Sequence, residues 1–258
     1  MKFIFLSLSL LLSLFAKEPK LELGAGVASL FYPHYIGSKS TNFLTLPFPH
    51  IRYRGDYLTI DEDGIKEKIF GVDGLRLDLS MSGSLPASSE KGGVKEGMPD
   101  LDLTGEIGLQ LIYNFFKKDI FKLELELPLR TVLATDYTSI EYVGLVSNPQ
   151  LKYSLYYTNF EWTLRTSLLF NDANYNNYYY GVKKIYETPQ RSYYDSKGGF
   201  SGFKTRVGMT YQKDNWWVGA FFSYYNISNA VFSDSPLVET DSAFYTGASV
   251  AYIFYTED

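Results

Sequence analysis

Residues 119–130, DIFKLELELPLR, alternate apolar and charged side chains, and this stretch constrains the fold more than any other. One face carries Phe121, Leu123, Leu125, Leu127 and Leu129, and the other carries Lys122, Glu124, Glu126 and Arg130. Alternation of this kind predicts a β-strand with one apolar and one polar face. In a soluble sandwich the apolar face would pack on a second sheet. In an outer-membrane barrel it would face lipid, and the charged face would line the lumen.

The alternation recurs along the chain and predicts an all-β fold of about 12 antiparallel strands, with about ten as the alternative. Pro47 and Pro49 fall inside the second expected strand, and because proline cannot donate a ladder hydrogen bond we expect a bend or a strand end there. Residues 131–149 are expected to form a longer connection. The expected strands are 21–32, 43–53, 57–60, 65–70, 75–82, 101–113, 119–130, 151–157, 160–169, 200–211, 216–225 and 244–254.

The connections between these strands alternate in length. Every second connection is short, at 54–55, 71–74, 115–118, 158–159 and 212–213. The others are mostly long, with the turn at 62–64 as the exception. Short periplasmic turns, long extracellular loops and an even strand number are typical of a transmembrane β-barrel. A soluble exported sandwich is the competing prediction, but it gives no reason for loop lengths to segregate.

Aromatic residues are abundant, with 23 Tyr and 19 Phe. A set of them falls near the short-turn ends of the expected strands, where the interfacial girdle of a barrel would lie. Packing inside a sandwich is the other interpretation, and their position at strand ends disfavours it. The set comprises Tyr113, Phe115, Phe116, Tyr157, Phe160, Trp162, Trp216, Phe254 and Tyr255.

The first 16 residues have the features of a secretory signal peptide. Lys2 gives a minimal positive start, residues 3–15 are apolar apart from serines, and Ala16 precedes a polar stretch. The apolar run is too short to cross a membrane as a helix. Leu14 departs from the cleavage pattern, which prefers a small residue there. We therefore expect a signal peptide at 1–16 and a single barrel domain at 17–258, with a membrane-anchored N-terminus as the alternative.

Several short motifs occur in an order that resembles the MipA/OmpV family of outer-membrane proteins, the MltA-interacting proteins. They span nearly the whole chain after the expected signal peptide. The motifs are Pro33-x-Tyr35-x-Gly37-Ser38, Leu46-Pro47, Tyr53-Arg54-Gly55, Asp73-Gly74-Leu75, Gly97-Met98-Pro99-Asp100-Leu101-Asp102, Tyr179-Tyr180-Gly181-Val182 and Asp234-Ser235-Pro236-Leu237-Val238.

The resemblance implies a barrel in the outer membrane of a Gram-negative cell, in contact with outer-membrane lipid. For some members it implies a scaffold role that links a murein hydrolase and a murein synthase in the periplasm. Others look like porins or adhesins. Two functions are therefore expected as alternatives: a non-enzymatic scaffold for murein-remodelling enzymes, or a small-solute, porin-like channel. A monomeric barrel is expected in either case.

Charged residues on the face opposite the leucines form a candidate lumen. Their acidic excess predicts a cation preference if the barrel conducts. The same charges could instead only stabilise the barrel wall. The candidates are Arg76, Asp78, Asp102, Glu106, Lys122, Glu124, Glu126, Arg130, Lys152, Glu161 and Arg165.

The long connection at 171–198 is rich in Asn and Tyr and is a candidate extracellular recognition loop, because tyrosine offers a large contact area at low entropic cost. A loop folded over the barrel mouth is the alternative. The candidate residues are Tyr175, Tyr178, Tyr179, Tyr180, Tyr186, Tyr193 and Tyr194.

Composition argues against several other functions. A net charge of −5 disfavours nucleic-acid binding, and the absence of cysteine excludes disulfides and thiolate metal sites. The two histidines, His34 and His50, lie in neither a nucleophile-elbow nor a zinc-protease motif. The acidic cluster at 61–63 lacks the spacing of a calcium loop. We expect no enzymatic activity, no metal and no cofactor.

Overall fold

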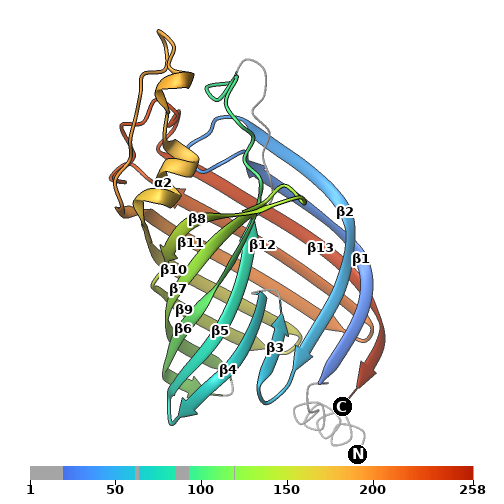
Figure 1. Ribbon diagram of the computed structural model, residues 1–258. Helices are drawn as coiled ribbons and strands as arrows, with labels where there is room; N and C mark the ends of the chain where they lie inside the picture. Colours follow the sequence, from blue (N-terminus) through green and yellow to red (C-terminus); the bar gives the residue numbers. More distant parts are fainter. Residues whose placement is uncertain (1–19, 62–63, 85–92, 119, 258) are drawn as a thin grey trace, which may run out of the picture.

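The computed structural model describes residues 20–61, 64–84, 93–118 and 120–257. The signal peptide expected at 1–16 lies outside these residues. The strands form one antiparallel sheet in which β11 pairs with both β12 and β10, so the sheet closes into a barrel (Figure 1). In chain order they are β1 (Leu21–Pro33), β2 (Thr41–Arg54), β3 (Leu58–Asp61), β4 (Gly64–Val72), β5 (Leu75–Ser84), β6 (Leu103–Lys118), β7 (Phe121–Thr135), β8 (Ile140–Ser147), β9 (Gln150–Tyr157), β10 (Phe160–Asn171), β11 (Gly199–Lys213), β12 (Trp216–Asn226) and β13 (Ser242–Glu257).

β8 and β9 occupy a single position in the wall, so the 13 strands make a 12-stranded barrel. β7 pairs with β8 along its second half and with β9 along its first half. The expected connection at 131–149 is therefore wrong, because 131–135 complete β7 and 140–147 form β8. The ladder shifts register between Val132 and Leu133, and Val143 and Gly144 are both buried opposite this bulge. A bulge disrupts the two-residue alternation that sequence reasoning relies on.

The prolines of β2 do not interrupt the strand. β2 pairs with β1 along its whole length, with Pro47 opposite Val27 and Pro49 opposite Ala25. The expected bend or strand end is therefore wrong. The expected turn at 115–118 also belongs to a strand, since β6 extends to Lys118.

Apolar side chains form a belt on the outside of the barrel. Leu109 lies opposite Leu129 across the β6–β7 ladder, and Val27 lies opposite Val250 across the β1–β13 ladder. These four side chains are 42–59% exposed. Soluble monomers rarely expose apolar surface on this scale, whereas a membrane barrel presents it to lipid. The competing prediction of a soluble sandwich is wrong.

Exposed aromatic rings gather at the short-turn ends of the strands, as predicted. The rings of Tyr113 and Phe115 lie 5.0 Å apart, and the rings of Trp216 and Tyr252 lie 5.3 Å apart. All four side chains are exposed. Amphipathic rings at one end of the strands are typical of a membrane–water interface.

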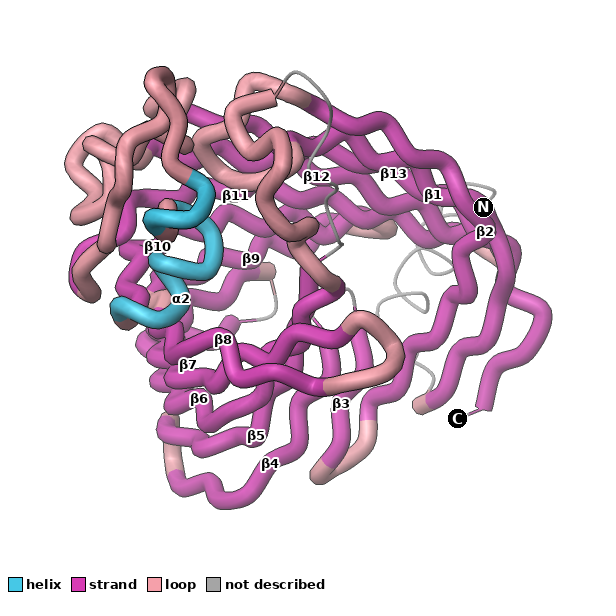
Figure 2. Tube along the Cα trace, turned by 45° about the horizontal axis from the view of Figure 1, so that its top comes forward, coloured by secondary structure: helices cyan, strands magenta, loops and turns pink. Residues whose placement is uncertain are grey.

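The long connections pack together over part of the other end of the barrel, which we call the cap (Figure 2). The β10–β11 connection contains α2 (Ala173–Tyr180) and a short 3-10 helix, η2 (Lys184–Tyr186). Tyr180 joins a buried apolar cluster with Tyr35, Leu101 and Phe232, each from a different connection. No helix in the described ranges is long and apolar enough to cross a membrane. The cap consists of residues 34–40, 93–102, 172–198 and 227–241.

Candidate functional site

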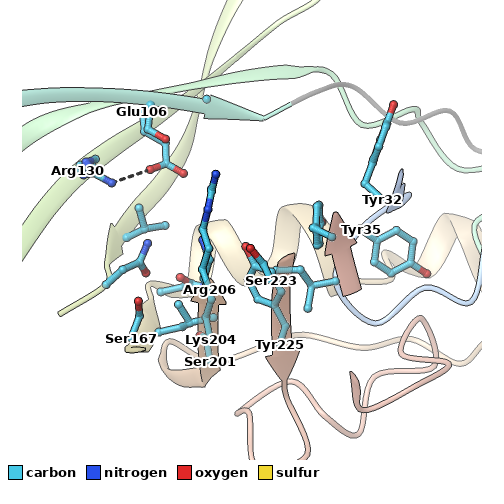
Figure 3. A pocket seen from close by; sticks show the side chains of 18 of the residues that line it. Tyr32, Tyr35, Glu106, Arg130, Ser167, Ser201, Lys204, Arg206, Ser223 and Tyr225 are labelled. Atoms are coloured by element: carbon cyan, nitrogen blue, oxygen red, sulfur yellow. Dashed lines mark hydrogen bonds and ion pairs between the residues drawn. The ribbon is translucent and has the colours of Figure 1, made fainter. Parts of the chain in front are cut away.

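Below the cap the barrel encloses a cavity of about 590 Å³ (Figure 3). It is lined by inward-facing residues from opposite parts of the wall and by tyrosines of the cap. Its volume is within the range of small-molecule sites, which is about 300–1,000 Å³. The cavity is therefore the candidate functional site.

One side of the cavity is basic. Lys204 and Arg206 lie two residues apart on β11 and share its inner face, and Arg165 of β10 lies opposite Arg206 in the ladder. Aromatic rings contact both β11 cations. Lys204 Nζ lies 5.1 Å from the centroid of Tyr225, and the guanidinium carbon of Arg206 lies 4.0 Å from that of Phe221. The rings hold both cationic groups at the wall, and both residues line the cavity.

Two of the three carboxylates that line the cavity, Glu106 and Glu126, are bonded to their neighbours. Arg130 Nη1 lies 3.4 Å from Glu106 Oε2, and Arg130 Nη2 donates to Gln110 Oε1 at 2.8 Å. Gln150 donates a hydrogen bond to Glu126. The lining contains five basic and three acidic side chains. The cavity lining is thus net basic, whereas the residues predicted from the sequence carry an acidic excess.

Tyrosines of α2 form part of the cavity lining. The helix begins after Asp172, whose carboxylate accepts the backbone N–H of Tyr175 at 2.8 Å. Burial raises the pKa of Tyr175 and of Tyr180 well above the usual value, so both hydroxyls stay protonated. The Tyr180 hydroxyl donates to the carbonyl of Ile36 at 2.9 Å. This bond ties α2 to the β1–β2 connection.

Nearer the short turns the interior carries a cluster that we call the plug: Glu22, Phe48, His50, Arg54 and Trp217. The fully buried Glu22 carboxylate lies 3.1 Å from Arg54 Nη1 and 3.3 Å from His50 Nε2. The Trp217 ring lies 5.0 Å from the His50 ring and 5.8 Å from the Phe48 ring. All five residues come from β12, β1 and β2, so the plug lies on one side of the lumen below the cavity.

The eleven residues predicted to line the lumen fall into two groups. Five line the cavity, namely Asp102, Glu106, Glu126, Arg130 and Arg165. The other six, Arg76, Asp78, Lys122, Glu124, Lys152 and Glu161, lie nearer the short turns. Their contacts there are the pairs Arg76–Asp78 at 2.9 Å, Lys122–Glu124 at 2.7 Å and Arg52–Glu161 at 3.6 Å, with Lys152 opposite Glu124 in the ladder.

Three basic residues of the cavity were missed by sequence reasoning: Lys66, Lys204 and Arg206. A signal was present for the last two, because they alternate with Phe203, Thr205 and Val207 in the same way as the charged residues of 119–130 do. Lys66 lies on the short β4, where alternation is harder to detect.

The tyrosines of the candidate recognition loop mostly pack inward. Tyr175, Tyr179 and Tyr180 line the cavity, and the Tyr178 hydroxyl accepts the backbone N–H of Asp102 at 2.9 Å. Tyr186 and Tyr194 are half-buried. Tyr193, at 47% exposure, is the exposed member of the set. The alternative of a loop folded over the barrel mouth describes this segment better than a display of tyrosines.

The histidines have structural surroundings. His34 Nε2 lies 3.2 Å from the side-chain oxygen of Asn42, and His50 belongs to the plug. In the part of the chain that the structure describes, no three histidine, aspartate or glutamate side chains are grouped to hold a metal ion.

A closed antiparallel barrel with an apolar belt, aromatic rings at its short-turn end and a polar interior defines the class: this is an outer-membrane β-barrel. The chain belongs to the MipA family, since the family model described as MltA-interacting protein MipA matches residues 23–254. Outer-membrane barrels have short turns in the periplasm and long loops outside the cell, so the cap faces the outside.

Relatives with known names are outer-membrane proteins. The chain is 29% identical to outer membrane protein Omp26La of Vibrio anguillarum over 216 residues, which cover 78% of this chain and 76% of the relative. It is 33% identical to OmpV of Vibrio cholerae over 85 residues, or 33% of each chain. Among solved structures it is similar to the COG4313 outer membrane channel of Pseudomonas putida F1, with a TM-score of 0.47 and 11% identity over 93% of this chain and 97% of that one.

Proposed function

We propose that the protein is a non-enzymatic uptake channel that binds small anionic solutes in its cavity. The observation that carries this proposal is the pair of cations on β11, Lys204 and Arg206, each held against an aromatic ring on a net basic lining. Basic residues in a pore attract anions and disfavour cations. A solute entering past the cap would meet this pair before it reached the plug.

The plug would act as the gate. Glu22 contacts both Arg54 and His50, and in this proposal the plug narrows the lumen so that passage requires these contacts to separate. Separating a buried ion pair is costly, and the cost keeps the lumen closed in the absence of solute. In this proposal a small anion, chloride included, that moves from the cavity to the plug competes with Glu22 for Arg54 and so opens the gate.

The test is uptake into proteoliposomes of two labelled solutes of similar size, anionic gluconate and neutral sorbitol. We expect gluconate to enter about tenfold faster than sorbitol. The double variant Lys204→Gln, Arg206→Gln should remove this difference. Lys213→Gln, at the exposed periplasmic end of the same strand, is the matched control and should leave uptake unchanged. Equal rates for both solutes, or no uptake through a correctly folded barrel, would refute the channel.

A scaffold role for murein-remodelling enzymes is the second candidate, because the family description names an interaction with MltA. The partner would have to contact the periplasmic turns, and these are short. The β9–β10 and β11–β12 turns contain only Thr158–Asn159 and Asp214–Asn215. Crosslinking from a photoreactive residue at Asn159 tests this role, and recovery of no murein enzyme from envelopes would count against it.

A further inference from the structure

The barrel wall has a weak seam between β2 and β3. β2 pairs with β1 from Thr41 to Tyr53, yet its pairing with β3 is confined to Tyr53 and Arg54. The β3–β4 hairpin is short, with Asp61 already opposite Gly64. Among the described residues, no strand pairs with the remaining length of β2 on this side (Figure 1).

Two prolines lie on the unpaired edge of this seam. Successive residues of a strand direct their backbone groups to opposite neighbours. At the end of β2, Arg54 donates its N–H to Lys20 on the β1 side, and Gly55 donates to Leu58 on the β3 side, both at 2.8 Å. The β1–β2 ladder has no bulge, so this alternation holds along the strand. The odd-numbered residues of β2 therefore direct their backbone N–H and C=O groups toward the seam.

Pro47 and Pro49 are therefore the residues whose missing N–H would have pointed into the seam. An unpaired N–H in lipid is costly because no water is present to bond it. Proline removes that donor, and it also discourages another strand from pairing with the edge. The seam is thus adapted to lie open to lipid.

Both faces of β2 are apolar beside the seam. Phe43 points outward and is 73% exposed, while Leu44 and Leu46 lie on the inner face. Leu44 lies opposite Leu30 of β1, and Leu30 lies opposite Gly247 of β13. The inner face therefore carries an apolar strip that leads away from the seam into the lumen.

The strip ends at the basic side of the cavity. Gly247 lies opposite Phe221, and a Cβ at this glycine would come within 2.6 Å of both Leu30 and Phe221. These two side chains therefore cover the glycine and make the strip continuous. Phe221 is the ring that holds Arg206. Lys66, on the far side of the seam, also lines the cavity.

We propose that the seam is a lateral entrance from the membrane into the cavity for a single-chain amphiphile with an anionic head group. Its acyl tail would lie along Leu46, Leu44 and Leu30, and its head would meet Arg206 and Lys204. This inference rests on the proposed anion-binding cavity and adds a route and a class of ligand. A strand from a second copy is the competing occupant of the seam.

The route is tested with single-cysteine variants, since the chain contains no other cysteine. A bimane label at Leu46→Cys, in vesicles of phosphatidylcholine with doxyl-labelled acyl chains, should be quenched nearly as strongly as one at the lipid-facing Phe43→Cys. Ser167→Cys, on the inner face where the wall is fully paired, should be protected. If the label at Leu46→Cys were as well protected from quenching as the label at Ser167→Cys, the lateral entrance would be overturned. Disulfide-linked dimers through Leu46→Cys would assign the seam to a second copy instead.

The ligand class is tested with a doxyl-labelled fatty acid and its neutral methyl ester. We expect the acid to quench the bimane label at Leu46→Cys at about tenfold lower concentration than the ester, and we expect the double variant Lys204→Gln, Arg206→Gln to abolish this difference. Equal binding of acid and ester would overturn the head-group assignment. Gluconate uptake separates the two proposals: if it persists while the fatty acid fails to bind, the lateral route is wrong and the channel stands.

Discussion

Tyr180 stacks on Phe232, with ring centroids 3.7 Å apart and planes inclined by 8°. The first residue ends α2, and the second belongs to the β12–β13 connection, so a single contact joins two long loops. Both side chains are almost fully buried. The Ser235 hydroxyl donates to the Tyr180 carbonyl at 2.7 Å, a second bond between the same two loops. The stack is therefore the centre of the cap.

Phe232→Ala should loosen the cap and leave the barrel folded. Removing a buried phenylalanine costs about 3–5 kcal/mol, and here the loss falls on loops rather than on the strand ladders. We expect faster proteolysis within 172–198 and an unchanged heat-modifiable band on gels. Ile185→Ala, at a side chain that is 82% exposed, is the control. Equal cleavage of the two variants would show that the stack does not hold the cap.

Lys95 should make the cap sensitive to pH. Burial, and secondarily the charge of Arg191, lowers the pKa of Lys95 from 10.5 to about 8. Between these values the opened cap binds more protons than the closed cap, so closure becomes more favourable as pH rises through the window, by at most about 3 kcal/mol. The Tyr35 ring, 5.1 Å from Nζ, reduces this effect by favouring the charged form.

The measurement is the rate at which a thiol reagent labels a cysteine at Leu101, compared between the native lysine and Lys95→Met. The reagent's own pH dependence is common to both proteins. The ratio of their labelling rates therefore reports the effect of Lys95 alone. We expect the native cap to become relatively more protected from pH 8 to pH 10.5. A ratio that is independent of pH would exclude a buried titrating lysine.

Glu22→Gln should destabilise the plug. The substitution keeps the shape of the side chain but removes the charge facing Arg54 and His50, and a broken buried ion pair costs about 3–5 kcal/mol. The urea midpoint of the protein in vesicles should fall, whereas Glu257→Gln at the exposed end of β13 should not change it. If the two variants unfold alike, the plug contributes no stability and cannot act as a gate.

Replacing Pro47 and Pro49 by alanine should promote association of the barrels. The change introduces two N–H donors at an edge without a described strand partner, and an unsatisfied buried donor costs about 1–3 kcal/mol. Pairing of two copies would relieve this cost, so crosslinked dimers should increase. Thr45→Ala lies on the same edge and already has its N–H, so it should remain monomeric. A monomeric double alanine variant would contradict the open seam.

Much of the barrel could be predicted from sequence because the alternation of polar and apolar residues that defines each strand is a local property. In 119–130 each residue shows by its own polarity which face it occupies, and the structure confirms a strand there from Phe121, with residue 119 outside the described residues. β8 was missed because a bulge places Val143 and Gly144 on the same buried side. The prolines were misinterpreted because the cost of a missing backbone N–H depends on whether a neighbouring strand would have accepted its hydrogen bond. The sequence of one strand does not show whether that neighbour exists.

The site was only partly predictable for the same reason. Alternation identifies inward-facing charges such as Glu106 and Arg130, but it does not show that they are bonded to each other. Nor does it show that Tyr180 packs inward, since its partner Phe232 is distant in the sequence. The sign of the cavity depends on which charged side chains line it, and the residues predicted from sequence did not include Lys66, Lys204 and Arg206.

The most direct test of the anion-binding cavity is the reversal potential of the purified barrel in a planar bilayer across a KCl gradient. We expect discrete conductance steps with a reversal potential displaced toward that of chloride, and we expect Arg206→Glu with Lys204→Glu to move it toward that of potassium. A reversal potential on the potassium side for the unmodified protein, or a correctly folded barrel that never conducts, would contradict the account.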